Sequence, residues 1–205
     1  MFVIITCIIA YAVMPRLIYY HSVWEGQAGK TAADMQAFID GPNGPSMGCM
    51  DNIVLGPVDS SMATLGFTPF FGSTSPLSPA PIKGSTIYMI QHHIKQGKSE
   101  AMFAKMGKLM SDSLTMARMT SKHKAQGFQN HTFMPVKDKT EGLFATCIWE
   151  AKEGVSAKAV QDMIDAHDAV GSDCCENKIF VVDASKANIN LAQVFHASTV
   201  ASVAS

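Results

Sequence analysis

Residues 146–184 (TCIWEAKEGVSAKAVQDMIDAHDAVGSDCCENKIFVVDA) align without a gap on residues 21–59 (HSVWEGQAGKTAADMQAFIDGPNGPSMGCMDNIVLGPVD), at an offset of 125 positions. Nine positions are identical: Trp24, Glu25, Gly29, Ala32, Gln36, Ile39, Asp40, Cys49 and Asn52 recur as Trp149, Glu150, Gly154, Ala157, Gln161, Ile164, Asp165, Cys174 and Asn177. This agreement indicates an internal duplication.

Each copy has the same local pattern. An apolar strand ends in Trp-Glu, and a Gly-containing turn follows. Thr31 or Ser156 then supplies an N-cap oxygen for a helix whose apolar residues recur on one side. A second strand follows at 52–55 or 177–182, so each copy predicts strand, helix, strand.

The second copy is preceded by further predicted elements. Residues 85–95 predict a strand, 99–121 one long helix with Met102 and Met106 on its buried side, and 127–135 another strand. A polar turn at 137–142 leads into a strand at 143–150. Residues 85–184 therefore predict an α+β, ferredoxin-like β-α-β-β-α-β domain, of which the first copy keeps only the back half.

The chain is accordingly expected to have five segments. These are an apolar N-terminal segment (1–16), a truncated ferredoxin-like half-repeat (17–65), a Pro/Gly/Ser linker (66–84), the complete domain (85–184) and a tail (185–205). The apolar run Phe2–Met14 is too short to span a bilayer and lacks the basic start of a signal peptide. It is interpreted either as a weak secretory or organellar signal or as an unrelated sequence in place of the missing front half.

The strand at 143–150 is apolar on both faces. Alternation places Leu143, Ala145, Cys147 and Trp149 on one face, and Phe144, Thr146 and Ile148 on the other. A sheet with two apolar faces needs a second layer, from the repeat or from another copy of the chain. We therefore expect antiparallel sheets packed as an α+β barrel, a homo-oligomer formed through sheet packing, and a central cavity for a small ligand.

Three features carry a family resemblance. The first strand of the complete domain runs into HHIKQGKSE (92–100), the second begins at Gly127-Phe128, and the third ends in Trp149-Glu150-Ala151. In these features residues 85–184 resemble the dimeric α+β barrel superfamily, which includes stress-responsive barrel proteins, cofactor-independent antibiotic-biosynthesis monooxygenases and small nickel-binding ferredoxin-like proteins. The first copy departs from this pattern. Members differ widely in activity, so the resemblance implies a fold rather than a function.

Composition excludes several classes of function. Charged residues are 16% of the chain, the formal net charge is -1, and no basic run occurs, which argues against nucleic-acid binding. No apolar run reaches the length of a membrane span, and no Gly-rich phosphate loop predicts a nucleotide. The odd number of cysteines is not a disulfide framework, and a cytoplasmic location is expected unless residues 1–14 act as a signal.

The candidate site residues lie on the predicted strands. His92 and His93 are adjacent, so only one of them can point into the cavity. The predicted ligand-binding residues are His92, His93, Asn130, His131 and Trp149. The predicted metal ligands are His92, His131 and Cys147, which as imidazole and thiolate suit nickel, zinc or copper. Trp149 is alternatively a packing anchor, and His123 is expected at a solvated helix end.

Three functions remain open on the sequence. The first is a barrel that binds a hydrophobic small molecule or a divalent transition metal without strong catalysis. The second is a cofactor-independent monooxygenase or cyclase that acts on a hydrophobic molecule, with histidine moving a proton. The third is a self-assembling structural module with unpaired strand edges. No catalytic residue is assigned.

Overall fold

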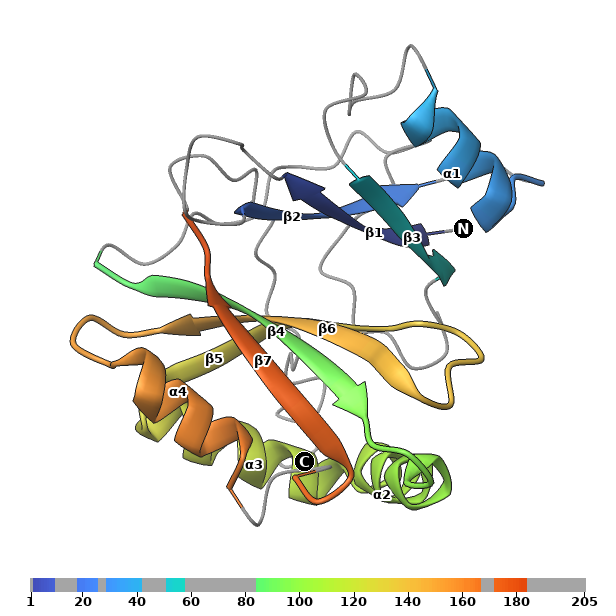
Figure 1. Ribbon diagram of the computed structural model, residues 1–205. Coiled ribbons are helices and arrows are strands. Elements are labelled where there is room, and N and C mark those ends of the chain that lie inside the picture. The colour runs from blue at the N-terminus through green and yellow to red at the C-terminus, as the bar shows by residue number, and fades with distance from the viewer. Residues whose placement is uncertain are drawn as a thin grey trace, which may run out of the picture. The chain divides into compact units, whose positions relative to one another are not determined.

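The computed structural model describes residues 2–9, 18–25, 29–41, 51–57, 84–166 and 172–183, and the chain divides into two compact units (Figure 1). The elements of the first unit are β1 (Phe2–Ile9), β2 (Ile18–Glu25), α1 (Ala32–Asp40) and β3 (Asp51–Pro57). Those of the second are β4 (Thr86–Ile94), α2 (Ser99–Ser111), α3 (Ser113–Ala125), β5 (Phe128–Pro135), β6 (Gly142–Ala151), α4 (Ala157–Ile164) and β7 (Cys175–Val181).

The first unit contains a three-stranded antiparallel sheet in the order β2-β1-β3. No strand is predicted for residues 1–16, yet Phe2–Ile9 forms the central strand and pairs with both neighbours. The run FVIITCII is rich in β-branched residues, which favour extended backbone. A continuous apolar run of this length is also typical of a buried central strand.

The two predicted N-caps are confirmed. The Thr31 hydroxyl accepts a hydrogen bond from the Asp34 backbone N–H at 3.2 Å, and the Asp34 carboxylate accepts one from the Thr31 N–H at 2.7 Å, which completes a capping box. The Ser156 hydroxyl accepts from the Ala159 N–H at 3.1 Å at the start of α4. Each cap therefore satisfies backbone donors that the first helical turn leaves unpaired.

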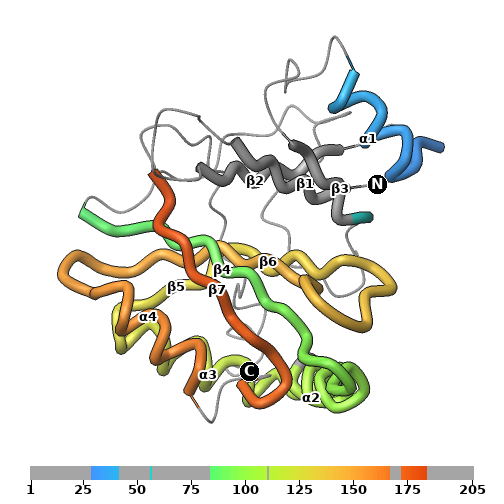
Figure 2. Tube along the Cα trace, in the orientation of Figure 1, coloured from blue at the N-terminus to red at the C-terminus, as the bar shows by residue number. Residues whose placement is uncertain are grey.

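The second unit contains a four-stranded antiparallel sheet in the order β5-β6-β4-β7. Helices α2, α3 and α4 lie on one side of this sheet, as Figures 1 and 2 show. The predicted α+β class is therefore correct. The expected barrel is not formed, because in the described residues β5 and β7 are the two edges of an open sheet.

The face of this sheet that α2–α4 cover, here called the helix face, carries the core of the unit. Tyr88 and Ile90 of β4 pack in one cluster with Val160 and Ile164 of α4. A second cluster contains Met102 and Met106 of α2, as their helical spacing predicted, packed with Ile94, Phe144, Ala145, Cys174 and Cys175.

The single helix predicted over 99–121 is wrong, because α2 ends at Ser111 and α3 begins at Ser113. Asp112 separates them with extended backbone. Its carboxylate accepts hydrogen bonds from the backbone N–H groups of Leu114 and Thr115, at 3.1 and 3.0 Å. An aspartate competes in this way with helical hydrogen bonding and starts a new helix instead.

A bulge corrects the predicted alternation in β6. His92 pairs with Ala145 and His93 with Leu143, so Phe144 is an extra residue opposite β4. A bulge interrupts the alternation of side chains. Phe144 therefore lies on the helix face, where its ring meets Phe103 and Phe133 at centroid distances of 6.1 and 6.2 Å, and not on the opposite face as predicted.

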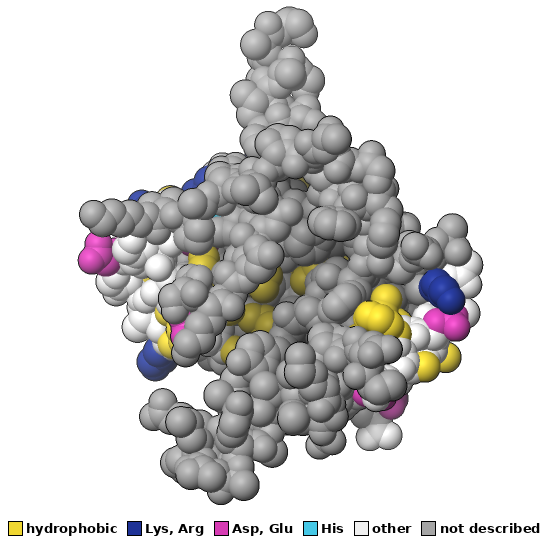
Figure 3. Space-filling view, turned by 90° about the horizontal axis from the view of Figure 1, so that it is seen from above, with side chains coloured by type: hydrophobic (Ala, Val, Ile, Leu, Met, Phe, Trp, Pro, Cys, Tyr) yellow, Lys and Arg dark blue, Asp and Glu magenta, His cyan; other side chains and the backbone are white. Residues whose placement is uncertain are grey.

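Side chains on the face of the sheet opposite the helix face are also buried. Ile87, Met89, Gln91, Thr132, Met134, Thr146 and Glu150 are each 1–8% exposed. This burial fits the expectation that water does not cover either face of the sheet. Other hydrophobic side chains reach the surface: Phe38, Leu114 and Val181 are at least half exposed, and Figure 3 shows hydrophobic side chains on one face of the molecule.

Two glycine substitutions are expected to change stability in opposite directions. Gly154 has φ +85° in the turn before α4, where an added Cβ meets no atom but strains the backbone. Gly154→Ala should lower the free energy of unfolding by about 1–2 kcal/mol, the cost of a left-handed conformation. Gly107 lies within α2 and is equally open, so Gly107→Ala should raise stability by about 0.5–1 kcal/mol. Urea unfolding of the two variants measures both, and changes of the same sign would contradict this account.

Candidate functional site

A cavity of about 1230 Å³ lies in the second unit between the helix face of the sheet and α2–α4. Its lining contains five methionines, which are Met102, Met106, Met116, Met119 and Met163. Phe128, Phe133 and Phe144 add aromatic surface. Methionine is flexible and polarizable, so such a wall adapts to apolar molecules of different shape.

Two irregularities of the chain contribute to this cavity. The bulge in β6 turns Phe144 toward the helix face, where it lines the cavity together with Cys147. The break at Asp112 separates α2 from α3, and both helices supply methionines to the lining. The cavity therefore depends on local exceptions to regular strand and helix geometry.

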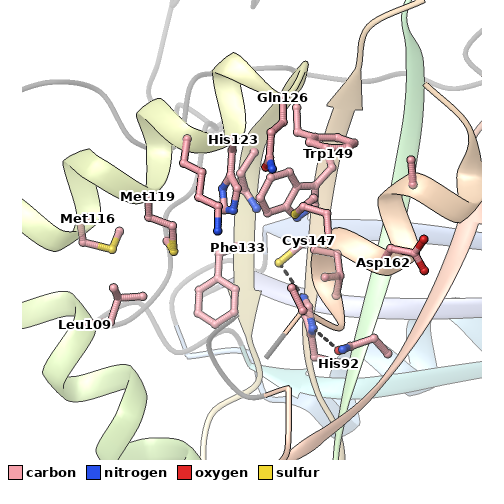
Figure 4. A pocket seen from close by; sticks show the side chains of 18 of the residues that line it. His92, Leu109, Met116, Met119, His123, Gln126, Phe133, Cys147, Trp149 and Asp162 are labelled. Carbon is pink, nitrogen blue, oxygen red and sulfur yellow. Dashed lines mark hydrogen bonds between the residues drawn. The ribbon is translucent and has the colours of Figure 1, made fainter. Parts of the chain in front are cut away.

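His92 of β4 lies at the polar end of the cavity (Figure 4). Its Nδ1 is 2.7 Å from Oδ1 of Asn177, and Nδ2 of Asn177 donates to the Asp165 carboxylate at 2.8 Å. Because the amide nitrogen is committed to Asp165, the amide oxygen must accept from His92 Nδ1–H. Gln161 donates to the other Asp165 oxygen at 2.6 Å.

Cys147 completes this series, with its Sγ 3.1 Å from Nε2 of His92. Since the His92 proton is on Nδ1, Nε2 accepts and the thiol donates. We refer to the five side chains Gln161, Asp165, Asn177, His92 and Cys147 as the polar relay. Its arrangement fixes the tautomer of His92 through the hydrogen bond on the far side of the ring.

Burial keeps both reactive groups of the relay neutral. Desolvation raises the pKa of the Cys147 thiol to about 12, and the nearby Asn130 and Trp149 side chains offset this only in part. Desolvation also lowers the pKa of His92, against the opposing effect of the Asn177 hydrogen bond. At neutral pH the pair is therefore a thiol and an uncharged imidazole.

Trp149, Asn130 and His123 surround the thiol. The Trp149 Nε1 and Asn130 Oδ1 atoms are buried and make no hydrogen bond of normal geometry within the described residues. The His123 and Trp149 rings are edge to face at a centroid distance of 5.2 Å (Figure 4). His123 lies in the last turn of α3, as expected of a helix end, but it is half-buried and lines the cavity.

Two of the predicted ligand-binding residues lie on the opposite face of the sheet. His93 alternates with His92, and its Nε2 is 3.2 Å from Gln91 Oε1. His131 is the extra residue of a bulge in β5, because Asn130 pairs with Trp149 and Thr132 with Ile148. Its Nε2 forms a buried hydrogen bond with the Glu150 carboxylate at 2.7 Å. The predicted ligand set is thus divided, with His92, Asn130 and Trp149 on the cavity side.

The same division separates the predicted metal ligands. His92 and Cys147 meet in the cavity, whereas His131 is engaged by Glu150 on the opposite face. Within the described residues no group of three or more His, Cys, Asp or Glu side chains has the geometry of a metal site. The adjacent Cys174 and Cys175 are buried thiols, and Cys175 Sγ is 3.7 Å from Met102 Sδ.

Residues 87–189, half of the chain, match a protein family described as a domain of unknown function (DUF8652). The chain belongs to this family. The DUF8652 region begins within β4 and extends beyond β7, so it contains the cavity and the whole polar relay. No curated protein and no solved structure matches the chain. None of the described helices is both long and apolar enough to cross a membrane.

Sequence reasoning missed three members of the polar relay in the DUF8652 domain. Gln161, Asp165 and Asn177 were recognised only as identical positions of the duplication, where they match Gln36, Asp40 and Asn52. The identity of these polar residues between the two copies was the signal in the sequence that could have pointed to them. The methionines contributed by α3 were not recognised as cavity residues, because the helix break at Asp112 was not predicted.

The relay predicts an alkaline loss of stability that depends on Cys147. An unfolded thiol ionises near pH 9, while the folded thiol keeps its proton up to a pKa of about 12. The unfolded state therefore releases the proton first as the pH rises. Above pH 9 this thiol should lower the free energy of unfolding by up to about 1.4 kcal/mol per pH unit. Urea unfolding between pH 8 and 10.5 should show a shallower decline for Cys147→Ser than for the wild type.

The lowered pKa of His92 predicts a corresponding loss of stability at acid pH. Its folded pKa is lowered, so the unfolded state binds the proton first as the pH falls below about 6.5. His92→Gln should therefore lose less stability than the wild type between pH 6.5 and 5. Slopes identical to the wild type in both variants would show that the pair is not neutral and buried as described.

Proposed function

We propose that the protein binds a hydrophobic small molecule in the cavity of its second unit, without strong catalysis. The cavity volume of about 1230 Å³ and its methionine-rich lining carry this proposal. Ligand sites are typically apolar cavities of about 300–1,000 Å³ with a few polar groups that fix orientation. His92, Asn130, Cys147 and Trp149 are such a group at one end of the lining.

Charge on the lining favours a ligand with an anionic end. Arg118 and Lys122 of α3 both line the cavity and are one helical turn apart. The one acidic side chain of the described lining, Asp162, is paired with Lys158 through contacts of 2.6 and 2.8 Å. A hydrophobic carboxylate would place its chain among the methionines and its charge toward the Arg118 guanidinium.

Metal binding receives less support from the same geometry. His92 Nε2 and Cys147 Sγ are close enough to share a metal, but they are two ligands where a protein site normally supplies three or four. His131, the third expected ligand, points to the opposite face of the sheet. The small-molecule part of the sequence expectation is therefore the part we retain.

At the level of fold, we infer that residues 85–184 form a ferredoxin-like domain and that the first unit is a shortened copy of it. The order β5-β6-β4-β7, with helices on one side, supports the first statement. Matching details support the second. Gly29 and Gly154 both have φ +85°, and the bonds Gln36–Asp40 and Gln161–Asp165 both measure 2.6 Å.

Strand register supports the same inference. In the first unit Cys7 pairs with Tyr20 on one side and Asn52 on the other. In the second unit His92 pairs with Ala145 and Asn177, which lie 125 positions after Tyr20 and Asn52. Strand β1 therefore has the position in its sheet that β4 has in the larger one. The expected unrelated segment would then supply the missing first strand.

Filling the cavity from α4 tests the proposed function. Ala159 lines the cavity, so Ala159→Phe should displace ligand and raise the Kd for cis-parinaric acid, a fluorescent polyene carboxylate, by about tenfold or more, which corresponds to about 1.4 kcal/mol. Ala157→Phe places the same side chain at an exposed position of the same helix and is the matched control. Fluorescence titration measures both.

The anionic end is tested separately. Arg118→Gln should weaken binding of cis-parinaric acid and leave binding of its methyl ester unchanged, because the ester has no charge to pair. Equal binding of the acid by the wild type, Ala159→Phe and Ala157→Phe would reject the cavity as the site. Equal effects of Arg118→Gln on acid and ester would reject only the role of charge.

A further inference from the structure

The polar relay runs from exposed Asp165 to a thiol in the cavity wall. Asp165 holds Asn177, Asn177 holds His92 through Nδ1, and His92 accepts from Cys147 through Nε2. A thiol 3.1 Å from an imidazole that a third group orients has the geometry of a nucleophile and its general base. Since protein groups engage both nitrogens of His92, the Cys147 sulfur is the relay atom left to meet a ligand.

A second observation points to a ligand at this place. The Trp149 and Asn130 side chains are 6% and 8% exposed and line the cavity, yet Trp149 Nε1 and Asn130 Oδ1 make no hydrogen bond of normal geometry within the described residues. Both side chains reach the Cys147 thiol only as weak hydrogen-bond partners, which lower its pKa against the larger effect of burial. Buried polar atoms are normally paired, so a ligand oxygen beside the thiol would supply a missing partner for the indole N–H.

The internal duplication repeats the residues that position His92 but does not repeat the reacting pair His92 and Cys147. Four of the nine identical positions are Trp149, Gln161, Asp165 and Asn177, which belong to the relay or lie beside its thiol. By offset and register, Cys147 corresponds to Ser22 and His92 to Cys7. The first unit therefore has the four recurring residues but lacks the thiol–imidazole pair. Any reaction of this pair is confined to the second unit.

We propose that Cys147 adds covalently to an α,β-unsaturated carbonyl group of a hydrophobic carboxylate held in the cavity, with His92 as the proton acceptor. This rests on the proposed function, since the cavity must first hold the molecule. As the sulfur forms a bond to the β carbon, the thiol proton moves to His92 Nε2 and the π pair of the double bond moves to the α carbon. The imidazolium then returns the proton to the α carbon. The S–H group has added across the double bond, and no other reactant is needed.

Selectivity is the expected signature of this reaction. A neutral buried thiol reacts slowly with reagents from water, because the thiolate is the nucleophile. An enone inside the cavity meets the thiol next to its base at high effective concentration. Cys147 should therefore react with a fitting hydrophobic enone and resist iodoacetamide, a small polar alkylating agent.

The experiment uses the full chain, 10-oxo-trans-11-octadecenoic acid as the reactive probe, and 10-oxooctadecanoic acid as its saturated analogue. Intact-mass spectrometry follows adduct formation, and peptide mapping locates it among the five cysteines. We expect one adduct, at Cys147, and a rate that falls by about 100-fold in His92→Gln, as loss of a general base predicts. His93→Gln alters the neighbouring histidine on the opposite face and should leave the rate unchanged.

Asn177 is a positioning residue in this scheme. Asn177→Ala should slow the reaction. The double exchange Asp165→Asn with Asn177→Asp should restore it, because the new carboxylate at 177 accepts from His92 Nδ1–H while the new amide at 165 donates to that carboxylate. Displacement of cis-parinaric acid by the saturated analogue shows whether each variant retains its cavity. Binding of the analogue without any enone adduct at Cys147 would overturn the covalent step and leave the binding function intact. Absence of analogue binding would overturn both. An adduct that forms equally fast in His92→Gln would remove the role of His92.

Discussion

The half-buried imidazole of His92 imposes the constraint on which the site depends. An uncharged histidine in a central strand needs a partner for each ring nitrogen, because an unpaired buried polar atom costs about 1–3 kcal/mol. Asn177 on β7 and Cys147 on β6 supply those partners from the strands on either side. A shift in the register of either strand would break one of these bonds, so the site and the alignment of three strands stabilise each other.

The sheet separates two polar centres of different character. On the cavity side, a neutral thiol and imidazole lie among methionines and aromatic rings. On the opposite face, His131 and Glu150 form a buried hydrogen bond, and Gln91 contacts His93. The adjacent residues His92 and His93 of β4 therefore lie in different environments, because side chains alternate between the two faces along a strand. The histidines of this protein are distributed between two faces rather than gathered around one metal.

Regular patterns in the sequence were sufficient for the strands and α4 of the second unit and for two N-caps, Thr31 and Ser156. The α+β class, the buried positions of Met102 and Met106, and the presence of one cavity-facing histidine at 92–93 all follow from periodicities of two and four residues. The errors occur where a local interaction overrides a period. Asp112 caps a helix inside an apparently continuous one, and the extra residues Phe144 and His131 change which face their strands present.

The extra residue at Phe144 also affects how the chain tolerates changes in length. Residues 137–141 form a polar, mostly exposed connection between β5 and β6, where an added or lost residue costs little because loop closure depends weakly on length. Within β6 the situation is reversed. Deletion of one residue near Phe144 would restore regular alternation and reverse the faces of the positions before it. Insertions and deletions among relatives of this chain should therefore accumulate in the connection 137–141 and be rare within β6.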